Sequence, residues 1–330
     1  MTEHGTLDTK LTVSYDDAEH IMKERATSFY QAFRHLPYER FQAVAAVYAF
    51  CRYADDTVDA DIDGQNKEKV LIALDELEEW LKSLYDSSLP PLDLPGQSWT
   101  FAFIDTIRRY SIPIDSFLLQ IEGQRSDANF HDLQTLEDLI LYSKRVAGSV
   151  GTMMLPILAE QQEYASDPDF IAACENLGIG MQITNILRDV GEDLRTRDRM
   201  YLPADLLKEY GIKRTDLEAL AVYSDAELVE GKIPKPFIKL WEVLSLQADT
   251  YYQDYEKFLD YFHPACRLPI VAAALSYHAI TDAVREASYN CFTKRCYTSL
   301  ATRESLIKQA SDFVKKNHNH PSNGCYAPGL

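Results

Sequence analysis

The chain has 330 residues, of which 46% are hydrophobic and 25% are charged. This profile is typical of a soluble globular protein with one large core or two domains. The formal net charge of −18 argues against nucleic acid as a partner, because phosphate backbones bind basic surfaces.

The predicted elements are helices, because long stretches lack both glycine and proline and strand patterns are scarce. In chain order, the expected helices cover residues 16–34, 37–59, 67–86, 97–110, 113–125, 135–160, 167–194, 203–210, 215–222, 224–230, 234–262, 267–289 and 300–317. Residues 1–14 are predicted to form a flexible leader, and residues 318–330 a disordered tail. The sequence therefore predicts one all-α domain over residues 15–317.

Targeting and redox signals are few. No apolar run approaches the roughly 18 residues that span a bilayer, and the polar, acidic N-terminus carries no secretory signal. None of the six cysteines lies in a CxxC pair, which argues against a zinc site and predicts free thiols in a reducing compartment. We therefore expect a cytoplasmic protein whose contact with a membrane is at most peripheral.

A first helix face carries acidic side chains within an otherwise apolar segment. It presents Tyr48, Arg52, Asp55 and Asp59, whose steps of 4, 3 and 4 residues stack along one side of a helix. Asp56 points about 100° away. Aspartates one turn apart suit Mg²⁺, which combines one or two carboxylates with substrate phosphates and water. Taken alone, the motif also fits an acidic helix end in solvent.

A second helix face repeats the pattern and favours a metal site over an acidic helix end in solvent. Gln182, Asn185, Asp189 and Asp193 follow at steps of 3, 4 and 4 residues in another apolar segment. Polar groups on buried helices cost free energy unless something compensates them. Two such faces opposed in a helical bundle would hold hard cations, and the cations would hold a polyanion. Arg188 lies beside this face, one turn from Glu192, so a purely structural ion pair is the alternative.

The loop after the first motif offers a competing interpretation. The segment DADIDG, from Asp59 to Gly64, matches the start of an EF-hand calcium loop, but Val70 occupies the position of the bidentate glutamate. An ordinary acidic loop therefore explains it better, and a calcium-binding interaction protein is disfavoured.

Glycine within a predicted helix marks a third segment, YSKRVAGSVG at 142–151. A helical glycine costs about 0.5–1 kcal/mol relative to alanine, so Gly148 and Gly151 need a reason. One reason is close packing of two helices. The other is a kink that lets a long apolar substrate pass near the backbone.

The order and spacing of five segments resemble the squalene/phytoene synthase family, the head-to-head trans-isoprenyl diphosphate synthases. The segments are ATSFYQAF (26–33), AVYAFCRYADDTVD (46–59), YSKRVAGSVG (142–151), NILRDVGED (185–193) and RMYLP (199–203). Within the family the chain looks closest to the bacterial dehydrosqualene (4,4'-diapophytoene) synthases. One departure is that DLRTRDRMY is a residue longer than usual, which bears on Arg199.

The resemblance implies an isoprenoid synthase-type helical bundle with a central apolar cavity. It implies that Mg²⁺, for which Mn²⁺ could substitute, is bound by Asp55, Asp59, Asn185, Asp189 and Asp193. It assigns catalytic roles to Tyr48, Arg52, Tyr142, Arg188 and Tyr277. It assigns substrate binding to Ser28, Phe29, Phe33, Arg52, Val146, Gln182, Asn185, Arg199 and Tyr201. Because carbocations react with water, the cavity wall must be apolar, and its candidates are Phe29, Phe33, Val44, Val47, Val146, Met153, Met154 and Leu187.

The implied reaction is a magnesium-dependent head-to-head condensation of two farnesyl diphosphates, through presqualene diphosphate, to dehydrosqualene in carotenoid biosynthesis. The apolar product would require transient membrane contact for its release. No residues for an NADPH pocket are recognisable, so NADPH is not expected. The alternatives are a phytoene synthase that uses geranylgeranyl diphosphate, a squalene synthase that uses NADPH, and a non-catalytic lipid-binding helical protein. The oligomeric state is not predicted.

Overall fold

The computed structural model describes residues 3–59, 66–88, 93–223 and 232–318, without the side chains of residues 3–8, 27, 28 and 318. Every regular element in these ranges is a helix, which confirms the predicted all-α class. The elements are α1 (Glu3–Arg25), α2 (Thr27–Phe33), α3 (Tyr38–Asp59), α4 (Lys67–Tyr85), α5 (Thr100–Arg109), α6 (Ile114–Ala128), α7 (Leu136–Ser143), η1 (Lys144–Gly148), α8 (Ser149–Leu158), η2 (Tyr164–Ser166), α9 (Pro168–Arg197), α10 (Ala204–Glu209), α11 (Arg214–Ala221), α12 (Lys235–Tyr251), η3 (Asp254–Tyr261), α13 (Pro264–Glu286) and α14 (Leu300–His318).

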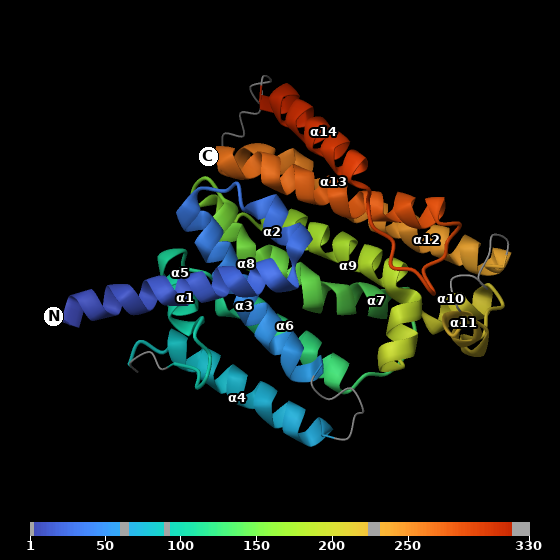
Figure 1. Cartoon of the computed structure of the whole chain (residues 1–330), viewed down its shortest axis with the longest axis horizontal. Coiled ribbons are helices and arrows are strands. Elements are labelled where there is room, and N and C mark those ends of the chain that lie inside the picture. Colours follow the sequence, from blue (N-terminus) through green and yellow to red (C-terminus); the bar gives the residue numbers. More distant parts are fainter. Residues whose placement is uncertain (1–2, 60–65, 89–92, 224–231, 319–330) are drawn as a thin grey trace, which may run out of the picture.

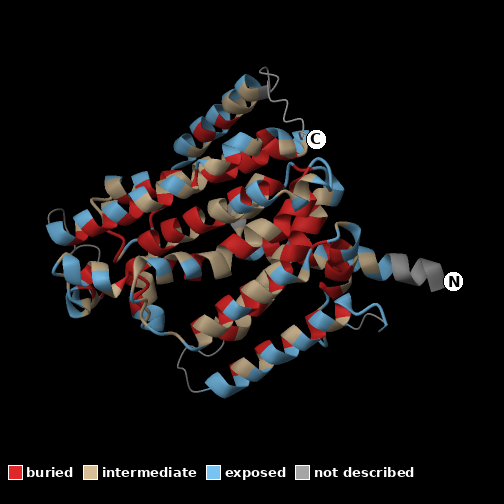
Figure 2. Ribbon diagram, turned by 180° about the vertical axis from the view of Figure 1, so that it is seen from behind, coloured by how far each residue is buried: buried red, intermediate tan, exposed pale blue. Residues whose placement is uncertain are grey.

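The helix α9 is the axis of the bundle. It packs against η1 and α8 on one side and against α12 and α13 on others, while α3 packs on α1, α5, α6 and α8. Figure 1 shows α4 and α14 on opposite outer sides of this assembly, and Figure 2 shows buried residues gathered on the helices between them. None of the described helices is long and apolar enough to cross a bilayer.

The N-terminal segment differs from its prediction. Residues 3–14 were expected to be a flexible leader, whereas they continue α1. Two side chains near the end of this segment pack into the fold. Ser14 Oγ accepts a hydrogen bond from the Ala102 backbone N–H at 2.8 Å, and Tyr15 donates to Asp105 at 2.7 Å. Because Ala102 lies in the first turn of α5, where backbone N–H groups lack partners within the helix, Ser14 supplies a cap from another helix.

Several predicted helices are interrupted. The expected helix 16–34 breaks at Ala26, which adopts φ −137°, so that α2 turns away from α1. The expected helix 234–262 ends at Tyr251 and resumes as the 3₁₀ segment η3. The predicted helix at 224–230 and the tail beyond residue 318 lie outside the described residues.

The glycine-containing segment 142–151 is both irregular and closely packed, and its role in admitting a substrate stays a prediction. The helix widens into the single π-helical turn η1, a local irregularity that often marks functional sites. A Cβ added at Gly151 would overlap the carbonyl of Cys174, and one at Gly178 would overlap the carbonyl of Ala147. The backbone of α9 therefore approaches those of η1 and α8 more closely than any side chain would allow. Gly151 and Gly178 also line an apolar cavity.

Candidate functional site

The last turns of α3 present the first acidic face. Arg52 lies 2.9 Å from the Asp55 carboxylate through Nη1 and also forms a short ion pair with Asp56. Asp56 therefore anchors the arginine from the neighbouring face, while Asp55 lines a cavity. Asp59 ends the helix and pairs with Arg197 at the end of α9, with 2.7 Å between Nη2 and Oδ2.

The second acidic face occupies the C-terminal half of α9. Arg188 donates to both carboxylate oxygens of Asp189, at 2.7 and 2.5 Å. The alternative of an Arg188–Glu192 pair is therefore wrong, since Glu192 is instead 3.4 Å from Arg295. Within the described residues, no basic side chain forms an ion pair with Asp193.

Both faces open into one polar cavity of about 1110 Å³. Of the predicted site residues, those that line it are Tyr48, Arg52, Asp55, Tyr142, Val146, Gln182, Asn185, Arg188, Asp189, Asp193, Arg199 and Tyr201. The structure thus brings these residues together from α3, α7, η1, α9 and the segment after α9, while their roles stay predictions. Asp59 stands at the rim through its pair with the lining residue Arg197.

A third polar face, on α6, was missed. Gln120, Gln124 and Asp127 are buried at steps of 4 and 3 residues, and all three line the polar cavity. The Oε1 atoms of both glutamines have no hydrogen-bond partner in the structure. The helical spacing of these three residues was a usable signal, but amides and a single acid on one helix are less conspicuous than paired aspartates.

Asp127 fixes the two tyrosines of this cavity. Tyr142 donates to its Oδ2 at 3.0 Å and Tyr201 to its Oδ1 at 3.1 Å, while Arg199 donates to its backbone carbonyl at 2.9 Å. Burial raises the pKa of Asp127, and the Arg199 charge and the two phenol donors oppose that rise. Burial likewise raises the pKa of Tyr142 well above its usual value. Both phenols are therefore neutral donors held in place, not free acids or bases.

The additional residue between the second motif and RMYLP is absorbed at the end of α9. Asp198 takes the left-handed conformation, with φ 51°, and Arg199 N donates to the Asp193 carbonyl at 3.2 Å. Arg214 holds the turn by donating to the Asp198 carbonyl at 2.9 Å. The insertion thus leaves Arg199 facing the cavity.

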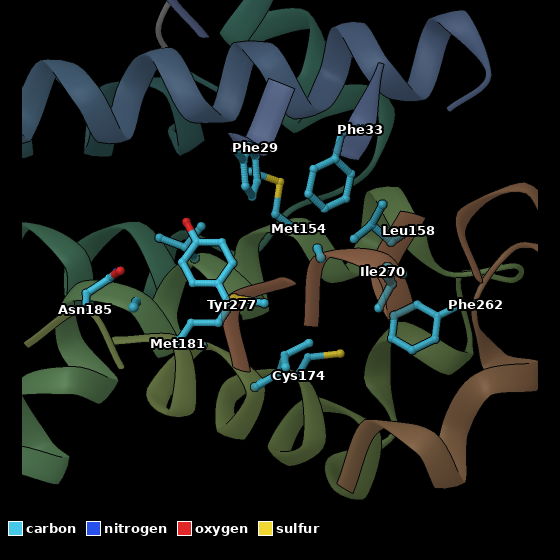
Figure 3. A pocket seen from close by; sticks show the side chains of 16 residues that line it. Phe29, Phe33, Met154, Leu158, Cys174, Met181, Asn185, Phe262, Ile270 and Tyr277 are labelled. Atoms are coloured by element: carbon cyan, nitrogen blue, oxygen red, sulfur yellow. The ribbon is translucent and has the colours of Figure 1, made fainter. Parts of the chain in front are cut away.

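A second, apolar cavity of about 880 Å³ adjoins the polar one, and Asn185 lines both. Figure 3 shows Asn185 at one end and Phe262 and Ile270 at the other, with Phe29 and Phe33 reaching in from α2. The rings of Phe29 and Phe33 are 4.4 Å apart. The predicted bundle therefore contains an elongated apolar chamber that leads away from the acidic faces.

Of the eight predicted wall residues, Val146 lines the polar cavity instead, and the other seven divide into two groups. Phe29, Phe33 and Met154 line the apolar cavity, as does the predicted catalytic residue Tyr277. The prediction was wrong for four others, which are fully buried in the core and line neither cavity: Val44, Val47, Met153 and Leu187. Periodicity marks an inward face, but it does not distinguish core from cavity. Ser28 lies in α2, and its side chain lies outside the described part of the chain.

The acidic faces are electrostatically suited to a divalent cation. Burial, aided by Asp59, raises the pKa of Asp55 to about 6, and burial, aided by Asp189, raises the pKa of Asp193 to about 7. The Oδ1 atom of Asn185 is buried without a partner. Oxygen atoms of this kind are the ligands that Mg²⁺ prefers.

The described residues contain no group of three or more His, Cys, Asp or Glu side chains that would hold a metal unaided. The alternative calcium loop lies largely outside the described residues, and Val70 is buried in α4.

A strap formed by residues 290–297 carries a further arginine to the site. The strap crosses α9 at Gly191, whose N–H donates to the Cys291 carbonyl at 3.0 Å, and a Cβ at Gly191 would overlap Phe292. Arg195 donates to the carbonyls of Phe292 and Ala221. Arg295 then lies 3.4 Å from Asp189 and lines the polar cavity.

Arg295 and Arg197 were missed for different reasons. Arg295 lies in an irregular segment without periodicity, so no sequence signal placed it. Arg197 follows Asp193 by four residues on the same helix face, which was a usable signal.

Comparison with known proteins gives one consistent result. The family model described as squalene/phytoene synthase matches residues 22–302. A chloroplastic phytoene synthase from an Oncidium hybrid cultivar is 34% identical over 316 residues, covering 94% of this chain and 71% of that protein. The Arthrospira platensis phytoene synthase is 33% identical, covering 86% of this chain and 88% of that protein. A solved dehydrosqualene synthase in complex with ligand has a TM-score of 0.79 at 31% identity, covering 94% of this chain and 99% of that chain.

The raised pKa values predict a pH dependence of stability. Each of Asp55 and Asp193 holds a proton more tightly in the folded chain than in the unfolded chain, where the usual value is 3.8. Their contribution to the free energy of unfolding is therefore fully present below about pH 4 and is lost as the pH rises through about 6 and 7. In chelator, we expect the urea midpoint of the wild type to fall over this window more than that of Asp55→Asn or Asp193→Asn. Parallel pH profiles of all three proteins would contradict the assignment.

Substitution of Gly191 tests the strap. Gly191→Ala places a methyl group where the strap backbone lies, so residues 290–297 must move and carry Arg295 away from Asp189. We expect a loss of about 1–3 kcal/mol in unfolding free energy, measured by urea titration, together with faster proteolysis near Arg295. Gly211→Ala is the control for destabilisation alone, because its φ of 66° strains an alanine while no atom lies near its Cβ position, so it should leave proteolysis near Arg295 unchanged. Unchanged proteolysis of Gly191→Ala would refute the strap contact.

Proposed function

The chain belongs to the squalene/phytoene synthase family, whose members are prenyltransferases that condense two isoprenoid diphosphates head to head, and from this premise we propose that it converts two farnesyl diphosphates into dehydrosqualene. The sequence resemblance to the family is thereby confirmed. One observation carries the proposal for the site: a polar cavity lined by two aspartate-bearing helices and several arginines shares Asn185 with an elongated apolar cavity. The first suits diphosphates and the second suits isoprenoid tails.

In the proposal, Asp55, Asp59, Asn185, Asp189 and Asp193 hold magnesium ions with the diphosphates. Bound magnesium supplies Lewis-acid stabilisation of the negative charge on a departing diphosphate. Asp193, which forms no ion pair among the described residues, and the partnerless Asn185 oxygen support this assignment, because each needs a cation or donor that this part of the chain does not provide.

The arginines of the polar cavity are proposed to bind and orient the diphosphates. Arg52, Arg188 and Arg295 are each held by a carboxylate of the acidic faces, which fixes their side chains before substrate arrives. Guanidinium groups pair with phosphate oxygens in bidentate fashion. Pre-positioned donors cost little reorganisation when charge develops on the leaving group.

The apolar cavity is proposed to exclude water from the allylic cations and from the cyclopropyl intermediate, presqualene diphosphate. Phe29, Phe33, Met154 and Met181 line it. Tyr48 lines the polar cavity and Tyr277 the apolar one, and burial raises the pKa of Tyr48 to about 12 and that of Tyr277 above its usual value. Both phenols stay protonated at neutral pH, so the released diphosphate is the proposed acceptor of the final proton. This route needs no NADPH.

Phytoene synthesis from geranylgeranyl diphosphate is the second candidate. It is favoured by the curated relatives, which include the phytoene synthases of Oncidium and Arthrospira at 33–34% identity. The solved dehydrosqualene synthase at 31% identity favours the shorter substrate. Under either proposal the enzyme acts in the cytoplasm and releases its product through transient contact with a membrane.

The proposed metal site at the acidic faces can be tested by chelation and by substitution. Excess chelator should abolish turnover and magnesium should restore it. Asn substitutions at Asp55, Asp59, Asp189 and Asp193 should each lower kcat by about 100-fold or more. Asp56→Asn is the matched control and should be milder, because Asp56 contacts Arg52 from a neighbouring face.

Unfolding measurements separate catalytic from structural roles. Asp55→Asn and Asp193→Asn should be at least as stable as the wild type at pH 7, since they remove strained charges. Asp189→Asn should be less stable, because it leaves the buried Arg188 without its partner. Full turnover in chelator, or equal damage at Asp56 and Asp55, would contradict this site.

The proposed substrate and product can be tested by product analysis. Incubation with farnesyl diphosphate and magnesium, followed by product chromatography, should give dehydrosqualene with or without NADPH. Phe33→Ala removes a ring from the cavity wall and should increase use of geranylgeranyl diphosphate relative to farnesyl diphosphate by about tenfold. Phe103→Leu, a buried ring outside the cavity, is the control and should keep the wild-type preference.

Each result of this assay is decisive. Preference of the wild type for geranylgeranyl diphosphate would replace the assignment by phytoene synthase. Squalene formed only with NADPH would replace it by squalene synthase. The absence of any product would favour a non-catalytic lipid-binding protein.

A further inference from the structure

Arg197 joins the ends of the two acidic helices. It is the last residue of α9 and its guanidinium is 2.7 Å from the carboxylate of Asp59, the last residue of α3. Helix C-termini carry partial negative charge, so this is the point where two helix ends and their aspartates would repel each other most. Among the described residues, Arg197 is the only cation that pairs with Asp59.

Arginine occupies every second position from 195 to 199 at this helix end, and the three side chains have different surroundings. Arg195 faces the strap and donates to the carbonyls of Phe292 and Ala221. Arg199 is held by Asp127 and Tyr201, and its side chain is only 13% exposed. Arg197 has the Asp59 carboxylate as its partner, and its side chain is 40% exposed. It is therefore the arginine of this group with the most freedom to move.

The position of Arg197 conflicts with a metal at Asp59. A magnesium ion needs direct contact with carboxylate oxygen at about 2.0–2.1 Å, and the guanidinium lies 2.7 Å from Oδ2 of this carboxylate, so a metal bound there would meet a like charge at close range. The two cations therefore compete for Asp59. An exposed ion pair contributes little free energy, so a divalent ion can displace it.

We propose that Arg197 is a built-in counter-ion that occupies Asp59 in the metal-free protein and leaves it when the first metal binds. The inference rests on the proposed role of Asp59 as a metal ligand. The displaced guanidinium remains at the wall of the polar cavity, which Arg197 lines. There it meets the diphosphate that arrives with the metal, and planar guanidinium groups bind phosphate oxygens well. Arg197 thus exchanges a carboxylate partner for a phosphate partner.

Titration of the substrate-free protein with Mn²⁺, followed by the electron paramagnetic resonance signal of free Mn²⁺, tests the competition. Arg197→Gln should bind Mn²⁺ about two- to five-fold more tightly than the wild type, because no guanidinium needs to be displaced. Arg197→Lys keeps the charge and should lie closer to the wild type. Arg109→Gln is the matched control, since Arg109 has similar exposure, 42%, and also pairs with an aspartate, Asp105, away from the site.

Thermal unfolding supplies a second readout. Without metal, Arg197→Gln should melt at a lower temperature than Arg109→Gln, and saturating Mn²⁺ should remove that difference. A variant that folds only when Mn²⁺ is present supports the proposal, because the metal then replaces the missing charge. A variant that fails to fold even with Mn²⁺ overturns it.

The other outcomes are equally decisive. Equal or weaker Mn²⁺ binding by folded Arg197→Gln, or no Mn²⁺ binding by either protein, overturns the competition. None of these measurements uses an isoprenoid substrate. Loss of the proposed function would show as an absence of product with tighter Mn²⁺ binding intact, whereas failure of this inference would leave the wild-type product unchanged.

Discussion

This structure depends on one constraint: carboxylates that lie inside an apolar helical bundle must be paired with cations. α3 and α9 must be largely apolar to pack, yet each brings aspartates to the same cavity. The compensation by the chain's own side chains is uneven. Arg52 pairs with Asp55, Arg188 with Asp189 and Arg197 with Asp59. Asp193 has no partner among the described residues and a pKa raised to about 7. The cavity therefore keeps a carboxylate without an internal counter-ion, which supports the proposed binding of further cations.

Close backbone contacts bring together the elements that carry these charged side chains. Gly151 and Gly178 let α9 approach α8 and η1 until no Cβ would fit between them, and the apolar cavity lies along this contact. Gly191 does the same for the strap that carries Arg295. In each case a residue that weakens its own helix gives a shorter distance between elements. The free energy that glycine costs a helix is small compared with the free energy of the arginine–aspartate hydrogen bonds.

Much of the helical architecture could be predicted from local pattern. The expected helices 67–86 and 300–317 agree with α4 and α14 to within a residue at each end. The misses occurred where tertiary contacts decide. The acidic, polar N-terminal segment resembles a flexible leader, but Ser14 caps α5 and Tyr15 bonds to Asp105, so α1 forms against other helices. The break at Ala26 lies within a continuous helical pattern and has no proline or glycine to mark it.

By itself, the sequence determined the helix class, the two aspartate faces and the family, because all three depend on the order and spacing of residues along the chain. Only the tertiary structure decided which polar groups share the cavity. Gln120, Gln124 and Asp127 join from α6, and Arg295 arrives on an irregular strap. The structure also separated cavity wall from core, placing Phe33 in the first and Val44 in the second. The physical reason is that spacing reports which way a side chain points, whereas the distance to groups on other helices depends on how the helices pack.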